Sequence, residues 1–299
     1  MDNQMTRQET AVSLYLDLMK RCLLDSIFID DPLANFILYQ KNPQTKFWKR
    51  WAILFLERFL LRYRLKLVQP YSTPWVTDFT ALSELELRNY REYGKEWPAR
   101  AHTMIGQKRL DNLQFCVETV LRDGIPGDLI ETGVWRGGAC IFMRAILAAY
   151  GDQGRSVWVA DSFRGLPPPS PDKYAADLND NWYTFDALAV SLEEVQANFR
   201  RYDLLDDRVR FLKGWFKDTL PTAPIERLAV LRLDGDMYES TIQALNALYD
   251  KLSPGGFVII DDYFLRPCAQ AVHDFRNSRG ITDPIIDIDE MGSYWQRSA

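Results

Sequence analysis

The chain has 299 residues, of which 47% are hydrophobic and 26% are charged, and its formal net charge is −5. This composition is typical of a folded globular chain, and the acidic balance argues against a nucleic-acid-binding protein that relies on overall positive charge. The four cysteines form no C-x-x-C pair and we recognise no cleavable N-terminal leader, so we expect a reduced, cytoplasmic protein rather than a zinc module or a secreted disulfide scaffold.

A basic, aromatic segment marks the N-terminal part of the chain. Residues 41–70 hold eight Lys or Arg residues and a single acidic residue, Glu57. Within them, Trp48–Val68 is rich in Trp, Phe and Leu, but charges interrupt it too often for a transmembrane helix. We expect a helix that needs an apolar partner. That partner would be the protein's own core or a second subunit, which we favour, or a membrane surface, or an apolar substrate in a covered cleft.

Prolines and scattered charges make residues 70–100 look like a connecting segment, in which Leu82–Tyr93 would form a short helix. We therefore divide the chain at this point. Residues 1–100 form a helical extension that acts as a lid or oligomerisation region, and residues 101–299 form the main domain.

From residue 103 onward, short apolar runs alternate with segments of helical length. The runs predict buried strands at residues 128–134, 156–161, 209–213, 228–234 and 256–262. The segments between them include helices expected at 141–150, 192–202 and 242–252. This alternation predicts an α/β fold, with a mainly parallel sheet and helices on both faces. In such sheets, ligands bind beyond the carboxyl ends of the strands.

A glycine-rich turn follows the first predicted strand. Residues Glu131–Gly138 read ETGVWRGG, and their glycines would let the backbone approach a ligand at the start of the next helix, where amide groups are free. The turn has neither the P-loop pattern nor the dinucleotide G-x-G-x-x-G spacing. It suggests an S-adenosylmethionine site, although a turn that serves only packing fits the same residues.

The next two strand ends also fit an adenosyl ligand. Asp161 and Ser162 end the second predicted strand, where a carboxylate can accept hydrogen bonds from both ribose hydroxyls, or can act only as a turn residue. The third strand runs into Gly214, Trp215 and Phe216. These two aromatic side chains would border an adenine ring or simply close the core.

Acidic side chains gather at the ends of the last two predicted strands. Asp234 and Asp236 end one strand, and Asp261 and Asp262 end the next. Carboxylates that converge in one crevice repel one another unless a cation is present, and oxygen ligands suit Mg²⁺. The chain has only two histidines, which argues against zinc or non-haem iron. Solvated carboxylates that cap helices are the alternative.

A magnesium ion beside a methyl donor has a definite chemical use. It would lower the pKa of a substrate hydroxyl and hold the oxygen in line with the sulfonium methyl group. Asp234 would then accept the proton as general base, and Asp236 is the competing candidate.

The motifs resemble those of the macrocin O-methyltransferase (TylF-type) family of metal- and S-adenosylmethionine-dependent sugar O-methyltransferases, which includes the mycinamicin and novobiocin pathway enzymes. The matching segments are AHTMIG (101–106), RLDNL (109–113), GDLIETGVWRGGACIF (127–142), VWVADSF (157–163), GWFKDTLP (214–221), RLDGDMYEST (232–241), LSPGGFVIIDDY (252–263) and AVHDFR (271–276). They occur in the order that the family shows.

The resemblance implies a Rossmann-like methyltransferase fold with a helical lid over the active site. It places the metal ligands at Asp234, Asp261 and Asp262, with Asp234 also the base. It implies methyl-donor contacts at Thr103, Met104, Ile105, Glu131, Thr132, Gly133, Val134, Trp135, Asp161, Ser162, Gly214, Trp215 and Phe216. The implied acceptor is a small-molecule glycoside, methylated on a sugar hydroxyl, and we expect a homo-oligomer.

Two departures from the family pattern leave the acceptor open. Asp30, in the segment Ile29–Pro32, stands where the antibiotic enzymes carry Glu, and the chain between this segment and Ala101 is much longer than in those enzymes. In the loop at residues 167–186, three aromatic side chains would stack on a sugar or only anchor the loop. They are Tyr174, Trp182 and Tyr183.

Other interpretations stay open beside this one. The same motifs would suit a noncatalytic adenosyl-ligand-binding or assembly protein. The basic segment would suit a methyltransferase of membrane-associated lipid-linked glycans. We expect structural roles for His102, and for His273 on the helix after the last predicted strand.

Overall fold

The computed structural model of the protein describes residues 2–27, 36–37, 69–70, 83–96, 98 and 100–298. The helix predicted at 48–68 and the segment Ile29–Pro32 lie outside the described residues. Two short strands, β1 (Phe36–Ile37) and β2 (Gln69–Pro70), pair antiparallel. Within the described ranges, no helix has the length and apolar character needed to cross a lipid bilayer.

A seven-stranded sheet of order β5-β4-β3-β6-β7-β9-β8 forms the centre of the fold. Its strands are β3 (Asp128–Thr132), β4 (Val157–Asp161), β5 (Val209–Lys213), β6 (Leu228–Leu233), β7 (Leu252–Ile260), β8 (Ile286–Asp287) and β9 (Ser293–Gln296). Strands β3 to β7 run parallel, which confirms the predicted mainly parallel sheet. The chain moves outward from β3 to β5 and then returns to place β6 beside β3. The strand order therefore reverses between β3 and β6, where such sheets bind ligands.

The far edge of the sheet differs from the prediction. Strand β7 begins at Leu252, ahead of the expected residue 256, because Leu252 pairs with Leu228 before an irregularity in the register. Strand β9 then pairs antiparallel with β7, and β8 with β9. These last two strands were not predicted from the sequence, because β8 has only two residues, both exposed, and β9 has only four.

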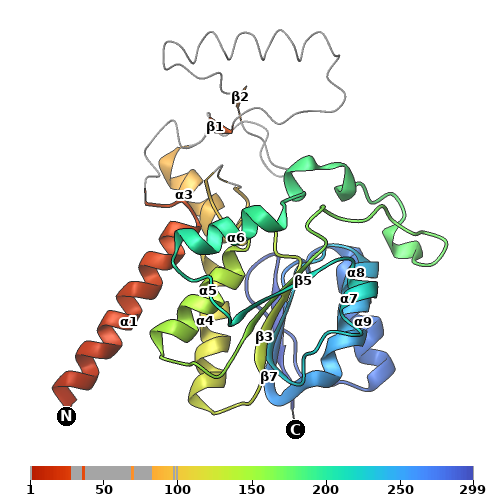
Figure 1. The fold of residues 1–299 in the computed structure, drawn as a ribbon. Coiled ribbons are helices and arrows are strands. Elements are labelled where there is room, and N and C mark those ends of the chain that lie inside the picture. The colour runs from red at the N-terminus through yellow and green to blue at the C-terminus, as the bar shows by residue number, and fades with distance from the viewer. Residues whose placement is uncertain are drawn as a thin grey trace.

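Helices cover both faces of the sheet (Figure 1). One face carries α4 (Gly106–Arg122), α5 (Gly138–Ala149) and α6 (Leu192–Arg201), and the other carries α7 (Phe216–Thr219), α8 (Tyr238–Leu248) and α9 (Arg266–Arg279). Side chains alternate between the two faces along each strand. In β3, for example, Leu129 joins the core under α4 and α5, whereas Ile130 joins the core under α8 and α9. The predicted helices are confirmed, with α5 and α8 beginning earlier than expected.

Two helices of the N-terminal region pack on the main domain. Helix α1 (Asp2–Leu23) lies against α5, with Leu16 and Leu23 fully buried. Its exposed Leu14 and Leu18 are compatible with an oligomer, which stays a prediction. Helix α3 (Glu84–Glu92) confirms the expected short helix and begins with a capping box between Ser83 and Glu86. The division of the chain at residue 100 stays a prediction, although α1 shares the core of α4 and α5.

Candidate active site

A cavity of about 350 Å³ opens at the carboxyl ends of the parallel strands. Residues that directly follow each of these strands lie on its wall, from Gly133 after β3 to Asp261 after β7. Its volume falls within the range of small-ligand sites. The position agrees with the crevice predicted from the strand order.

The cavity wall includes all but one of the predicted methyl-donor residues. These are Thr103, Met104, Ile105, Glu131, Gly133, Val134, Trp135, Asp161, Ser162, Gly214, Trp215 and Phe216. Thr132 is the exception, since it is buried in β3 and does not line the cavity. Its backbone carbonyl accepts a hydrogen bond from Asp234 N at 2.9 Å. Thr132 therefore helps to join β3 to the segment after β6.

The glycine-rich turn is shaped by close approach of backbone segments. Gly133 has φ 85°, and a Cβ atom there would lie 1.6 Å from the carbonyl oxygen of Asp234. Gly138, at the start of α5, donates to the carbonyl of His102 at 2.9 Å, and a Cβ atom on it would lie 2.4 Å from the same oxygen. A side chain at either position would force backbone apart. These glycines thus hold three wall segments together.

Asp161 joins the turn to the end of β4. Its Oδ2 accepts a hydrogen bond from Val134 N at 2.8 Å, and its Oδ1 accepts one from Phe163 N at 2.6 Å. Burial raises the pKa of this carboxyl. The Ser162 hydroxyl is a second donor to Oδ1, at 3.4 Å, so the contacts of Asp161 within the protein are those of a turn residue, and a ribose hydroxyl would have to share its oxygens with them. The contact with ribose stays a prediction.

Three carboxylates meet on the part of the cavity wall that follows β6 and β7. Asp234, Asp261 and Asp262 each offer an oxygen atom, and these atoms lie within 4.8 Å of one another. We call them the acidic triad. Burial and then the charge of Asp261 raise the pKa of Asp234 well above its usual value. Burial and the neighbouring aspartates do the same to the pKa of Asp262. A nearby positive charge would offset this repulsion, so the donor set fits a hard divalent cation.

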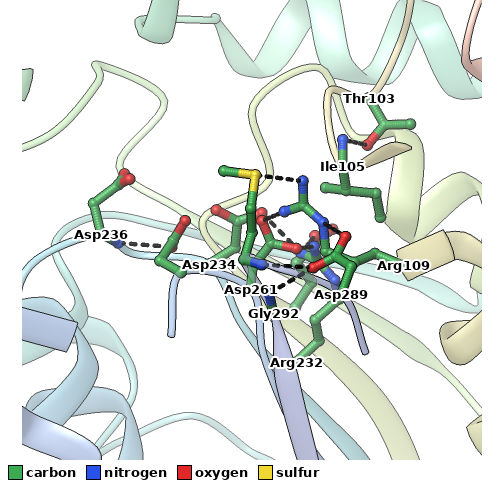
Figure 2. A network of polar contacts seen from close by, with 12 residues as sticks. Thr103, Ile105, Arg109, Arg232, Asp234, Asp236, Asp261, Asp289 and Gly292 are labelled. Carbon is green, nitrogen blue, oxygen red and sulfur yellow. Dashed lines mark hydrogen bonds and ion pairs between the residues drawn. The ribbon is translucent and has the colours of Figure 1, made fainter. Parts of the chain in front are cut away.

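Two buried arginines, which were not predicted from the sequence, hold Asp234 and Asp261 of the triad in place (Figure 2). Arg232, in β6, pairs with Glu131, with Asp261 and, at 2.9 Å, with Asp234. Arg109, from α4, pairs with Asp261 and lies 3.3 Å from Asp289. Together they contact both oxygens of Asp261. A carboxylate has about four lone-pair sites, so these pairs leave Asp261 able to bind a cation as well.

The signals for these arginines were present but weak. Arg232 interrupts a strand whose other residues are apolar and buried, which is unusual unless the charge is paired. Arg109 belongs to the RLDNL segment, which contributed to the family resemblance, but no residue of this segment was assigned a role in the site. Their partners lie far away in the sequence, so spacing could not identify them.

Asp236 lies on the cavity wall outside the acidic triad. Its backbone has φ 56°, and its amide donates to Asp262 Oδ2 at 3.0 Å. Figure 2 shows its carboxylate turned away from the arginine cluster. Burial, followed by the charge of Asp261, raises the pKa of Asp236 to about 7. Asp234 and Asp236 therefore both line the cavity, and each carboxylate binds a proton more readily than that of an ordinary aspartate.

The other candidate side chains divide between the cavity and the remainder of the protein. Trp182 lies on the cavity wall, whereas Tyr174 packs against Tyr238 and Tyr183 is exposed. His273 lies on α9 as expected and is 3.0 Å from the Tyr263 hydroxyl, away from the cavity wall.

His102 Nδ1 lies 2.8 Å from the Tyr202 hydroxyl, and burial followed by nearby arginines lowers the pKa of His102 to about 4. Its backbone carbonyl, rather than its ring, connects it to the cavity wall through Gly138. These contacts fit the structural role expected from the sequence.

Comparison with known proteins identifies similar methyltransferases. Residues 12–297 match the family model described as macrocin-O-methyltransferase (TylF). The chain is 50% identical to 8-demethyl-8-(2,3-dimethoxy-alpha-L-rhamnosyl)-tetracenomycin-C 4'-O-methyltransferase of Streptomyces olivaceus, over 97% of this chain and 95% of that protein. It is 59% identical to mycinamicin III 3''-O-methyltransferase of Micromonospora griseorubida, over 70% of this chain and 84% of that protein. It is also 59% identical to demethyldecarbamoylnovobiocin O-methyltransferase of Streptomyces niveus, over 70% of this chain and 80% of that protein.

Solved structures show the same fold. The O-methyltransferase NovP is 46% identical and superposes with a TM-score of 0.75, over 96% of this chain and all of that one (100%). The calicheamicin methyltransferase CalS11 is only 17% identical, with a TM-score of 0.52 over 87% of this chain and 95% of that one, and it supports the fold alone. The expected Rossmann-like methyltransferase fold and the expected family resemblance are both confirmed.

Proposed function

Because the chain belongs to the macrocin O-methyltransferase (TylF) family, and is therefore an O-methyltransferase, we propose that it transfers a methyl group from S-adenosylmethionine to a sugar hydroxyl of a glycosylated natural product with the help of Mg²⁺. The observation that carries this proposal is that the glycine-rich turn after β3 and the acidic triad after β6 and β7 line the same cavity. Such a cavity would place a methyl donor beside a cation.

The methyl donor would occupy the side of the cavity built by β3, β4 and β5. The amide groups in the first turn of α5 that follow Gly138 would receive its carboxylate, and Asp161 would receive its ribose hydroxyls. Trp215 and Phe216, which lie on the wall after β5, would border the adenine. Glu131 is held by Arg232 and by the Cys140 thiol, which lies 2.9 Å from Oε2. It therefore offers a fixed carboxylate on this part of the cavity wall.

The acidic triad would hold the cation. When bound, Mg²⁺ supplies positive charge that lowers the pKa of a nearby hydroxyl. Arg109 and Arg232 pair with Asp261 and would keep it in place beside the cation. We assign Asp234 as the base that accepts the hydroxyl proton, and Asp236 as its alternative, because both carboxyl groups face the cavity.

The acceptor would be a deoxysugar attached to a larger scaffold. The tetracenomycin relative, which matches nearly the full chain, is named for a rhamnosyl compound. Trp182, on the cavity wall, would supply an aromatic face for the sugar ring. A rhamnosylated polyketide is therefore the first acceptor to test.

A methyl-transfer assay tests the proposal. Purified protein would be incubated with S-adenosylmethionine, Mg²⁺ and each of three acceptors: the dimethoxy-rhamnosyl tetracenomycin, mycinamicin III and demethyldecarbamoylnovobiocin. We expect a product heavier by one methyl group and an equal amount of S-adenosylhomocysteine, both lost when a chelator replaces Mg²⁺. Donor binding without turnover of any acceptor would instead support the noncatalytic adenosyl-ligand-binding protein. Turnover that is unchanged by chelator would contradict the role of the cation.

A further inference from the structure

A long loop between β4 and α6 forms one wall of the cavity. It contains three short 3-10 helices, η2 (Ala175–Asp177), η3 (Trp182–Thr184) and η4 (Asp186–Leu188). Pro167, Pro168 and Trp182 bring the loop into the cavity wall. We call residues 165–190 the β4–α6 loop.

One residue of this loop reaches the first turn of α8. Asp177 is only 1% exposed, although the residues around it in the loop are exposed or half-buried. Its Oδ1 accepts a hydrogen bond from Tyr238 N at 2.7 Å, and its Oδ2 accepts one from Glu239 N at 2.9 Å. The first amides of a helix lack partners within the helix. Asp177 therefore caps α8 from a position 61 residues earlier in the chain.

Helix α8 has no side-chain cap of its own. The residue before it, Met237, makes no side-chain hydrogen bond to the first turn. A negative charge at this end of a helix is favourable in addition to the hydrogen bonds. The contact between the rings of Tyr174 and Tyr238, with centroids 5.7 Å apart, extends the same attachment. The loop and the helix start thus depend on each other for their positions.

The capped first turn of α8 directly follows the segment that carries the two candidate bases, Asp234 and Asp236. Tyr238 is two residues after Asp236 and four after Asp234. The β4–α6 loop is also attached at its other end, where the Trp135 indole Nε1 donates to Ala187 O at 2.8 Å. Trp135 belongs to the glycine-rich turn. The loop is therefore fastened on one side to the predicted donor site and on the other to the segment that carries the candidate bases.

We propose that Asp177 is a positioning residue that fixes the β4–α6 loop, with Trp182, against the turn that carries Asp234 and Asp236, and so determines how the acceptor sugar is held. The proposal rests on the proposed function. Asp177 itself does not line the cavity, so it acts through the loop and through α8. Loss of the attachment would loosen acceptor binding and leave the donor side, which is held by Gly133, Asp161 and Gly138, unchanged.

Asp177→Ala removes the attachment, and Asp172→Ala is its matched control. Asp172 lies in the same loop, has the same charge and is exposed. A lost pair of charge-assisted hydrogen bonds predicts about a ten- to hundred-fold increase in KM for the acceptor in the Asp177→Ala variant. We expect the Kd for S-adenosylmethionine, measured by calorimetry without acceptor, to change less than about twofold. Asp172→Ala should leave both values unchanged.

Hydrogen exchange provides a readout that needs no turnover. The amides of Tyr238 and Glu239, and those of the β4–α6 loop, should exchange faster in Asp177→Ala than in the unmodified protein or in Asp172→Ala. Asp177→Glu, which keeps the charge, should recover part of the protection.

The outcomes separate the two proposals. If the unmodified protein methylates none of the three acceptors, the proposed function fails, while hydrogen exchange still decides whether Asp177 holds the loop. Unchanged exchange in Asp177→Ala would overturn the attachment. Faster exchange with an unchanged KM for the acceptor would overturn the role of Asp177 in positioning the acceptor. An increase in the Kd for S-adenosylmethionine as large as the increase in the acceptor KM would overturn it as well.

Discussion

The two sides of the cavity are built by opposite means. The side after β3 and β4 depends on residues without side chains, since Gly133 and Gly138 let backbone segments approach within contact distance. The side after β6 and β7 depends on charged side chains, where Arg109 and Arg232 offset part of the charge of the acidic triad. The first side is sensitive to volume and the second to charge. Substitutions on the first side should therefore act on donor binding and those on the second side on the cation and proton transfer, with the exception of Gly133, which also lies against the backbone of Asp234.

The largest expected effect comes from the carboxylate that serves as base. Asp234→Asn keeps the volume and removes the charge, so kcat should fall by about 10²–10⁴-fold, with weaker cation binding and little change in the Kd for S-adenosylmethionine. Asp236→Asn should lower kcat by less and keep cation affinity. A larger loss of kcat in Asp236→Asn than in Asp234→Asn, measured at saturating Mg²⁺, would identify Asp236 as the base.

Arg232→Met tests the charge balance on the same side. The substitution leaves the buried carboxylates Glu131, Asp234 and Asp261 without their shared partner, and breaking a buried ion pair costs about 3–5 kcal/mol. Chemical denaturation should show that loss in the free energy of unfolding, and Mg²⁺ should restore part of it. Arg210→Met, at an exposed position of β5, is the control. An equal loss in both variants would contradict a special role for Arg232.

Gly133→Ala tests the side that is sensitive to volume. The added Cβ would lie 1.6 Å from Asp234 O, whereas Gly151, also with positive φ, has open space around its Cβ position. Gly151→Ala should cost about 1 kcal/mol through its backbone alone. Gly133→Ala should in addition weaken S-adenosylmethionine binding by about tenfold or more, since the turn must shift. Calorimetric titration of the donor compares them, and equal affinities would show that the turn does not bind it.

The smallest expected effect is a dependence of stability on pH through His102. Folding lowers the pKa of this residue from 6.5 to about 4, so the unfolded chain binds a proton that the folded protein excludes. This pKa difference makes the free energy of unfolding depend on pH. Its contribution is complete above pH 6.5 and is lost as the pH falls toward 4, and it amounts to at most on the order of 3 kcal/mol. His102→Asn can keep the hydrogen bond to Tyr202 without titrating. Its Tm should therefore decrease less in this pH range, and parallel Tm curves for the two proteins would contradict the assignment.

Much of this candidate site could be predicted from the strand ends, because these site residues lie next to the strands in the sequence. Buried parallel strands appear as apolar runs, and residues such as Gly133, Asp161 and Asp234 directly follow them in the chain. The arginines could not be predicted in this way, because Arg109 and Asp261 are 152 residues apart and meet only after the sheet has formed. Asp177 was missed for the same reason, since its partners lie in a helix that begins 61 residues later. Strands β8 and β9 escaped prediction because they are short and pair only through tertiary contacts.

A crystal structure with S-adenosylhomocysteine and Mn²⁺, recorded at a wavelength where manganese scatters anomalously, would examine both sides of the cavity at once. We predict an anomalous peak bound by Asp234, Asp261 and Asp262, with the nucleoside beside Asp161 and the glycine-rich turn. An ion bound elsewhere, or no ion at the triad at saturating Mn²⁺, would contradict the division of the cavity into a donor side and a cation side.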